Sequence, residues 1–191
     1  IGPIPLKRSG IFSVKAFKNK QEYGPPINQE LAFHKGLGSS LVYEQKYSDW
    51  YTAGGDLGLT DGKLGSLDFR DGCWQGFYGD DVEAVVDLGK IKKVSSISTH
   101  FYQYNNSWIF LPSKLTFEIS LNGKEYTPIA EIERKRGPQE RGHFIEEFAT
   151  SNLNKKGRFI RVKAQSIKKV PAWHEAAGSK AWLFLDEIVI Q

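Results

Sequence analysis

Apolar and polar residues alternate along most of the chain with a period of two, the spacing of a β-strand that has one buried face. In KLTFEIS (114–120) and RFIRVKA (158–164) every second residue is apolar. No segment keeps helical spacing for more than about two turns. Further strands are expected at VEAVVDLG (82–89), VSSISTHF (94–101), YTPIAEI (126–132) and WLFLDEIVI (182–190). The pattern predicts an all-β sandwich.

Turn signals divide the chain between these strands. Asn122-Gly123 lies between two predicted strands and predicts a two-residue type I′ hairpin, which needs positive φ at both positions. The first 35 residues differ, because the strand pattern of IFSVKAFKNK (11–20) is interrupted by glycine and two prolines in EYGPPIN (22–28). They are too few to bury a core. We therefore expect residues 1–35 to be the end of a preceding module or a linker, and residues 36–191 to form a second unit.

Composition narrows the class of protein. A 191-residue chain with 25% charged residues is typical of one globular domain, and no apolar run reaches the ~20 residues of a membrane span. The net charge of +4 is dispersed, and the densest basic run, ERKRGPQERGHF (133–144), also carries acids and is interpreted as a solvated hairpin loop. This pattern predicts no nucleic-acid partner. The chain contains no methionine, even at position 1, as expected for a fragment of a longer protein.

Most catalytic signatures are missing or incomplete. His174-Glu175 begins like the zinc motif H-E-x-x-H, but Gly178 stands where the second histidine is needed. Asp186 and Glu187 are adjacent on a predicted strand, so their side chains point to opposite faces and cannot flank one glycosidic bond. The segment is not expected to be an enzyme, although a centre that assembles the four dispersed histidines in space stays an alternative.

Three predicted loops combine aromatic and polar residues: FYQYNNSWIFLP (101–112), VPAWHEAAGSKAW (170–182) and FRDGCWQGFYGDD (69–81). An aromatic ring can pack on the C–H face of a sugar while amides, imidazole, guanidinium and carboxylates bind its hydroxyls, so such loops suit glycan recognition. Trp74 and Trp182 are interpreted as core, whereas ligand contact and a structural role both stay open for Trp108 and Trp173. The candidate ligand-binding residues are Arg70, Asp71, Tyr104, Asn105, Asn106, Trp108, Trp173, His174 and Glu175.

A resemblance to a known family rests on ordered blocks over about residues 38–191. The blocks are YTAGGDLGLTDGKLGS, WQGFYGDDVEAVVDLG, WIFLPSKLTFEISLNGKEY, GRFIRVKAQ and PAWHEAAGSKAWLFLDEIVI. They resemble a coagulation-factor type C (discoidin-like) domain, and more narrowly the version at the C-terminus of Bacteroidetes family 20 β-N-acetylhexosaminidases, or chitobiases. Residues 1–35 resemble the end of the Ig-like module that precedes it. The resemblance implies an eight-stranded, jelly-roll-like, galactose-binding-domain-like β-sandwich.

The resemblance also implies a function. Bacterial domains of this kind are often non-catalytic carbohydrate-binding modules of secreted glycoside hydrolases. We expect the segment to hold such an enzyme on glycans with N-acetylhexosamine- or galactose-type sugars, at a secreted, periplasmic or cell-surface location, beside the other domains of the enzyme. The alternatives are a protein- or phospholipid-binding adhesion module, because SWIFLP (107–112) could form an apolar loop tip, and a structural spacer without ligand. Membrane binding is not expected, since the loops lack a basic collar.

Many relatives of this family hold a structural calcium ion. The segment TDGKLGS (60–66) supplies Asp61 and Ser66 at the matching spacing, Glu187 matches the closing acid, and the backbone carbonyl of Lys63 would complete the oxygen shell. Calcium is thus the one cofactor that the resemblance implies. The alternative for this segment is a glycine-rich turn held by an aspartate side chain.

Overall fold

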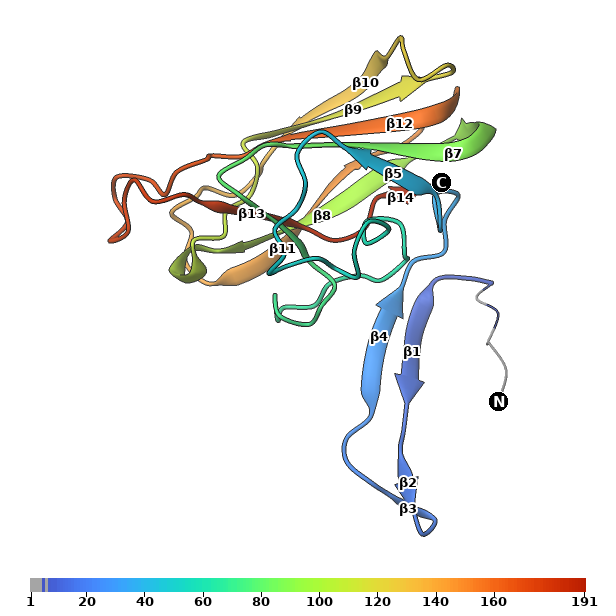
Figure 1. Ribbon diagram of the computed structural model, residues 1–191, viewed down its shortest axis with the longest axis vertical. Helices are drawn as coiled ribbons and strands as arrows, with labels where there is room; N and C mark the ends of the chain where they lie inside the picture. Colours follow the sequence, from blue (N-terminus) through green and yellow to red (C-terminus); the bar gives the residue numbers. More distant parts are fainter. Residues whose placement is uncertain (1–4, 6) are drawn as a thin grey trace.

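Two antiparallel sheets face each other in the computed structural model, which describes Pro5 and residues 7–191 (Figure 1). The first sheet has the order β10 (Thr127–Glu133), β9 (Lys114–Ser120), β12 (Lys155–Gln165), β7 (Val82–Val94), β5 (Ser40–Tyr43). The second has the order β11 (His143–Thr150), β8 (Ile97–Tyr104), β13 (Trp182–Leu185), β6 (Gln75–Tyr78), and β14 (Val189–Ile190) also pairs with β8. The predicted all-β sandwich is confirmed; among the described residues its two sheets contain five strands each.

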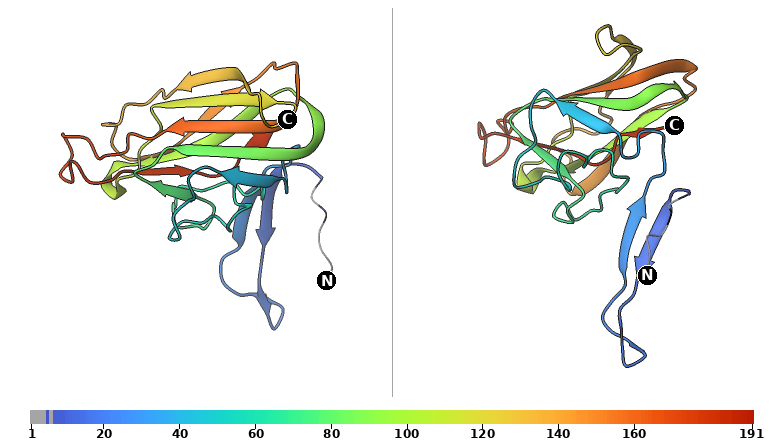
Figure 2. Two further views of the ribbon diagram at one scale, coloured as in Figure 1. Left: turned by 45° about the horizontal axis from the view of Figure 1, so that its top comes forward. Right: turned by 45° about the vertical axis from the view of Figure 1, so that its right-hand side comes forward.

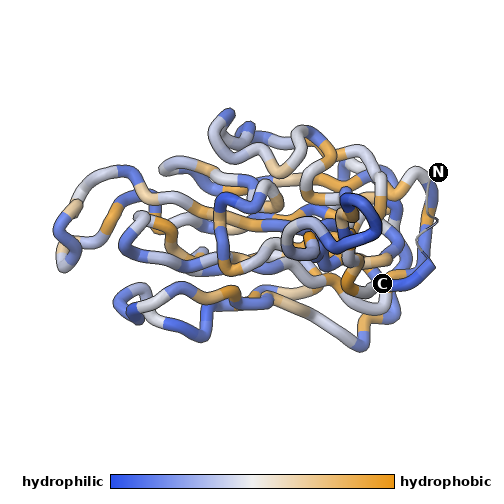
Figure 3. The backbone as a smooth tube through the Cα atoms, turned by 90° about the horizontal axis from the view of Figure 1, so that it is seen from below, coloured by the Kyte–Doolittle hydropathy of each residue, from blue (hydrophilic) through white to orange (hydrophobic). Residues whose placement is uncertain are grey.

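The core lies between the sheets, as the alternation requires. Leu115 and Phe117 from β9 pack in one apolar cluster with Phe101 of β8 and Leu183 of β13. Burying each such side chain stabilises the fold by about 1.5–3 kcal/mol. Figure 3 shows the hydrophobic stretches running along the sandwich while hydrophilic stretches gather in the connections.

Two local predictions are wrong. The β9–β10 connection is a six-residue loop, 121–126, in which Gly123 has a positive φ of 72° and Asn122 does not. The Asn122 side chain instead accepts hydrogen bonds from the backbone N–H groups of Lys124 and Glu125, which holds a wider turn. A two-residue turn with positive φ at both positions occurs at Asn19-Lys20, where φ is 52° and 66°.

The final predicted strand, 182–190, is divided into β13 and β14. Pairing stops at Asp186 and Glu187, whose side chains are buried and bind other parts of the chain. Asp186 accepts a hydrogen bond from the backbone N–H of Gly65, and Glu187 accepts one from that of Gly62. The two acids thus point to different partners, and they fasten the loop before β6 to the end of the chain.

A long ribbon projects from the sandwich in Figures 1 and 2. It consists of β1 (Gly10–Val14) paired with β4 (Ile27–Leu31), and of the short pair β2 (Phe17–Lys18) and β3 (Gln21–Glu22). At its base the Leu64 N–H donates to the Glu30 carbonyl. The assignment of residues 1–35 to a preceding module stays a prediction, and residues 1–4 and 6 lie outside the described residues.

Candidate functional site

Three connections meet at one end of the sandwich and enclose an open hollow of about 840 Å³. They are the turn η1 (Asn105–Ser107) after β8, the loop between β10 and β11, and the loop that precedes β13. A hollow of this size suits a small ligand. Its lining residues are Tyr104, Asn105, Asn106, Gln139, Arg141, Gly142, Trp173, His174 and Glu175. Six of the nine candidates from the sequence are therefore brought together here.

Asn105 joins the η1 turn to the β10–β11 loop. Its side chain is buried, and its Nδ2 atom lies 3.2 Å from both the Pro138 and the Glu140 carbonyl oxygens. Both bonds use the amide as a donor. Asn105 therefore positions the β10–β11 loop, whereas the sequence predicted that it binds a sugar hydroxyl.

His174 joins the loop before β13 to the η1 turn. The backbone N–H of Ala176 donates to its Nδ1 atom (3.1 Å), so the ring hydrogen must be on Nε2. Nε2 then donates to the Asn105 carbonyl oxygen at 3.0 Å. Both ring nitrogens are engaged, so His174 positions the loop and presents only its ring surface to the hollow.

The remaining lining side chains keep free polar groups. Asn106, Gln139, Arg141 and Glu175 are exposed, and their side chains make no hydrogen bond to the described residues. Trp173 is 42% exposed, and its ring meets the buried ring of Phe110 edge-on at 6.2 Å. The hollow thus combines an accessible aromatic face with a cation, a carboxylate and two amides.

Gln139 and Arg141 were not among the binding residues predicted from the sequence. They lie in the basic run 133–144, which was interpreted as a solvated hairpin loop. That interpretation is wrong, because the loop is not a hairpin: it connects β10 in one sheet to β11 in the other, and Asn105 anchors it against the hollow. The available signal was the Gly137-Pro138 turn between two strand-like segments, which indicates a shaped connection.

Three candidates lie outside this hollow. Trp108 is half-buried and packs into the apolar clusters on either side of it. Asp71 accepts backbone hydrogen bonds from Ser66 and Cys73 at 2.6 and 2.8 Å, which is a structural role. Arg70 lines a separate hollow and lies over the Phe69 ring. The expected core positions of Trp74 and Trp182 are confirmed, since they are 1% and 9% exposed.

The residues matched to a calcium site are engaged with protein donors. The Asp61 carboxylate accepts from the Lys63 backbone N–H at 2.9 Å, and the Lys63 ammonium lies 2.7 Å from its other oxygen. Ser66 Oγ accepts from the Asp68 backbone N–H. A calcium ion needs six or more oxygen ligands with free lone pairs. Here a lysine supplies the positive charge instead.

Glu187, the acid expected to close the calcium site, also contacts protein groups. Glu187 is fully buried; its Oε1 atom lies 2.8 Å from His34 Nε2, and its Oε2 accepts from the Gly62 N–H. Burial raises the pKa of Glu187, while the Gly62 hydrogen bond opposes the shift. Burial lowers the pKa of His34 to about 4. As arranged, the set of Asp61, Lys63, Ser66 and Glu187 does not fit the calcium ion that the resemblance implies.

The histidines do not assemble into one centre. His34 is buried against Glu187, His100 contacts Asp186, His143 contacts Tyr102, and His174 contacts the Asn105 backbone. The only carboxyl group in the hollow, within the described part of the chain, belongs to Glu175. A glycosidase uses two carboxyl groups across one bond, so this site lacks that arrangement.

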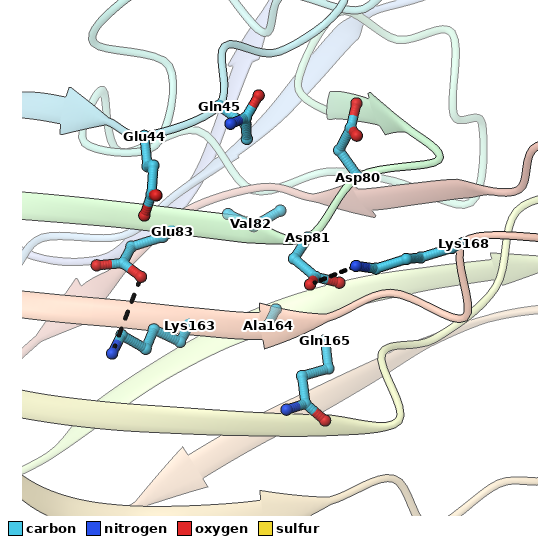
Figure 4. Close-up of a pocket in the computed structure, with 10 residues that line it drawn as sticks. All are labelled: Glu44, Gln45, Asp80, Asp81, Val82, Glu83, Lys163, Ala164, Gln165 and Lys168. Carbon is cyan, nitrogen blue, oxygen red and sulfur yellow. Dashed lines mark ion pairs between the residues drawn. The ribbon is translucent and has the colours of Figure 1, made fainter.

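Another hollow lies beside β7 and β12 (Figure 4). None of the described residues that line it is aromatic, and two of its four acids pair with its two lysines. Asp81 lies 3.0 Å from the Lys168 ammonium, and Glu83 lies 3.9 Å from that of Lys163. It offers no stacking surface, and its two charged groups that pair with no described residue, Glu44 and Asp80, are both acids.

Comparisons with known proteins agree with the fold. Residues 42–185 match the family model for the F5/8 type C domain. No curated protein matches the chain.

Solved structures resemble it at low identity. A Streptococcus pneumoniae fucose binding module is 15% identical, with 83% of this chain and 94% of that one covered and a TM-score of 0.52. A second S. pneumoniae fucose binding module is 11% identical, with coverage of 83% and 97% and a TM-score of 0.53. A chitosan-binding module of a chitosanase/glucanase from Paenibacillus sp. is 13% identical, with coverage of 83% and 98% and a TM-score of 0.50. At these identities the likeness concerns the fold.

Proposed function

Because the chain belongs to the F5/8 type C domain family, we propose that it is a non-catalytic carbohydrate-binding module that uses the hollow around Trp173. The observation that carries the proposal is the meeting of an exposed indole with free amide, guanidinium and carboxylate groups from three loops. The sugar-binding names of the structural neighbours support it.

Each group has a distinct part in the proposed complex. The Trp173 ring packs against the C–H face of a sugar, which buries apolar surface on both partners. Asn106 and Gln139 can donate to and accept from hydroxyls, Arg141 donates, and Glu175 accepts. Asn105 and His174 hold the loops in place before the ligand arrives, which lowers the entropy cost of binding.

The proposal also covers the parent enzyme, its location and the type of sugar. The resemblance of the sequence blocks supports a parent enzyme of the family 20 β-N-acetylhexosaminidase (chitobiase) type, in a secreted, periplasmic or cell-surface location. N-acetylhexosamine- and galactose-type sugars are then the ligands to test first. The module would hold the catalytic domain of that enzyme near its substrate, and would itself cleave nothing.

The alternative of a membrane-binding module relied on an apolar loop tip at SWIFLP. Ile109, Phe110 and Leu111 of SWIFLP are each at most 1% exposed, so the segment is not an apolar loop tip. No helix among the described residues is long and apolar enough to cross a bilayer.

A glycan array tests the proposal with wild type and Trp173→Ala. Wild type should bind a defined set of glycans, and Trp173→Ala should lose that binding while keeping its melting temperature. Ile91→Ala is a matched control, since Ile91 is an exposed apolar residue on β7 and does not line the hollow. Absence of binding to any glycan, or equal binding by Trp173→Ala, would overturn the proposal.

A further inference from the structure

A second open hollow, of about 500 Å³, lies in the loop region between β5 and β6. Trp50 stands at this hollow with 81% of its surface exposed, the largest exposure of any large hydrophobic residue in the described chain. A single exposed apolar residue is ordinary, but apolar surface that continues into a hollow lined by further aromatic rings is typical of a ligand-binding groove. The lining residues are Trp50, Tyr51, Thr52, Ala53, Gly54, Phe69, Arg70, Gly72 and Trp74.

Trp50 rests on a rigid aromatic base. Its ring lies 6.4 Å from that of Trp182, which packs in turn against Tyr51 at 5.3 Å and Tyr78 at 4.5 Å. The backbone turn at Trp50 is held by Ser48, whose Oγ accepts from the Trp50 N–H. One side of the indole is therefore supported by packed rings, and the rest is free for a ligand.

One aromatic contact joins the linings of the two hollows. Tyr104 lines the hollow around Trp173, Phe69 lines the hollow around Trp50, and the centroids of their rings lie 6.5 Å apart. The Arg70 guanidinium lies 4.9 Å above the Phe69 ring. Its donors, which bond to none of the described residues, lie in the Trp50 hollow beside the ring that contacts Tyr104.

This inference rests on the proposed function and names the class of ligand. We propose that the two hollows form one extended site, which takes a linear oligosaccharide from the Trp173 hollow, across Arg70, to a second stacking position on Trp50. A terminal single sugar would fill only the first hollow and would leave Trp50 exposed. The Arg70 donors then bind oxygens of the sugar units that pass from one hollow to the other.

An array that carries each sugar type as monosaccharides through hexasaccharides tests this proposal. Wild type should bind longer oligomers about tenfold more tightly than the monosaccharide, the size of effect expected from one further aromatic anchor. Trp50→Ala should remove that gain and leave monosaccharide binding unchanged, whereas Trp173→Ala should weaken binding at every length. Leu57→Ala, in the same loop but outside both hollows, is the matched control and should change neither.

Each outcome decides between the two proposals. Affinity that does not depend on length, or a length effect that survives in Trp50→Ala, would overturn the extended site while the Trp173 site stands. Binding that Trp173→Ala does not weaken, or no binding at any length, would overturn the proposed function and this inference together. A melting curve equal to wild type shows that Trp50→Ala is folded.

Discussion

His174 Nε2 lies 3.0 Å from the carbonyl oxygen of Asn105, a residue 69 positions earlier in the chain. This contact joins the loop before β13 to the turn after β8, and the Asn105 side chain joins that turn to the β10–β11 loop. The three connections around the hollow therefore form one hydrogen-bonded unit. The shape of the site depends on residues that need not touch a ligand.

His174→Ala should loosen this unit. The hydrogen bonds of His174 are partly buried, and a typical intramolecular hydrogen bond contributes about 0.5–1.5 kcal/mol, so we expect a lower free energy of unfolding and weaker glycan binding. Hydrogen exchange at the Ala176 amide should become faster, because its acceptor is His174 Nδ1. His174→Gln keeps a side-chain donor and should lose less. Weaker binding with unchanged stability and unchanged Ala176 exchange would instead show that His174 contacts the sugar.

The two tryptophans of the C-terminal segment should respond differently to truncation. Trp182 is buried among four aromatic rings, so Trp182→Ala should lower the free energy of unfolding by about 3–5 kcal/mol in a urea titration. Trp173 is far more exposed, so Trp173→Ala should change it by less than about 1 kcal/mol. Unfolding of the domain by Trp173→Ala would show that Trp173 is scaffold.

These contrasts show what local sequence can predict. Strand β9 coincides with the predicted segment 114–120. A strand with one buried face shows apolar and polar residues in alternation, so the local sequence is enough to predict it. The position of Trp182 follows from the same reasoning. The identity of a loop residue as core or contact depends instead on which distant segment meets it.

The hollow itself illustrates that limit. Arg141 reaches it because Asn105 binds the carbonyls of Pro138 and Glu140, and nothing near Arg141 in the sequence shows this contact. Trp50 was not predicted as a contact residue for a related reason. Its place above Trp182 depends on a segment far along the chain, which the local sequence does not show. Lys63 was expected to offer a carbonyl, but its ammonium reaches Asp61.

That Lys63–Asp61 pair leads to a prediction about metal. Because the cluster carries its own cation, neither a chelator nor millimolar calcium should move the melting temperature by more than about 1 °C. Asp61→Ala should lower stability equally with and without calcium. Differential scanning fluorimetry measures both effects. A chelator-induced decrease of several degrees in wild type, absent from Asp61→Ala, would restore the calcium site.

Cys73 offers a probe of the loop between β5 and β6. Burial raises the pKa of its thiol to about 11, so at pH 8 the reactive thiolate is scarce in the folded protein. The thiol should react slowly with Ellman's reagent at pH 8 and rapidly in guanidinium chloride. The unfolded thiol ionises first as the pH rises, so this group should also reduce stability above about pH 9. Free-thiol reactivity in the native protein at pH 8 would show that this loop opens.

The central claim is that a sugar binds beside Trp173, and the five indole N–H signals of the chain test it directly. The strongest-binding glycan from the array would be titrated into ¹⁵N-labelled protein, with each indole assigned by a Trp→Phe variant. The Trp173 indole and the Asn106 and Gln139 side-chain amides should shift with one saturable affinity, while the buried Trp74 indole should not move. Saturable binding that leaves Trp173 unmoved, and instead shifts the backbone amides of Asp81, Lys163 and Gln165, would place the ligand in the hollow of Figure 4 and contradict the account.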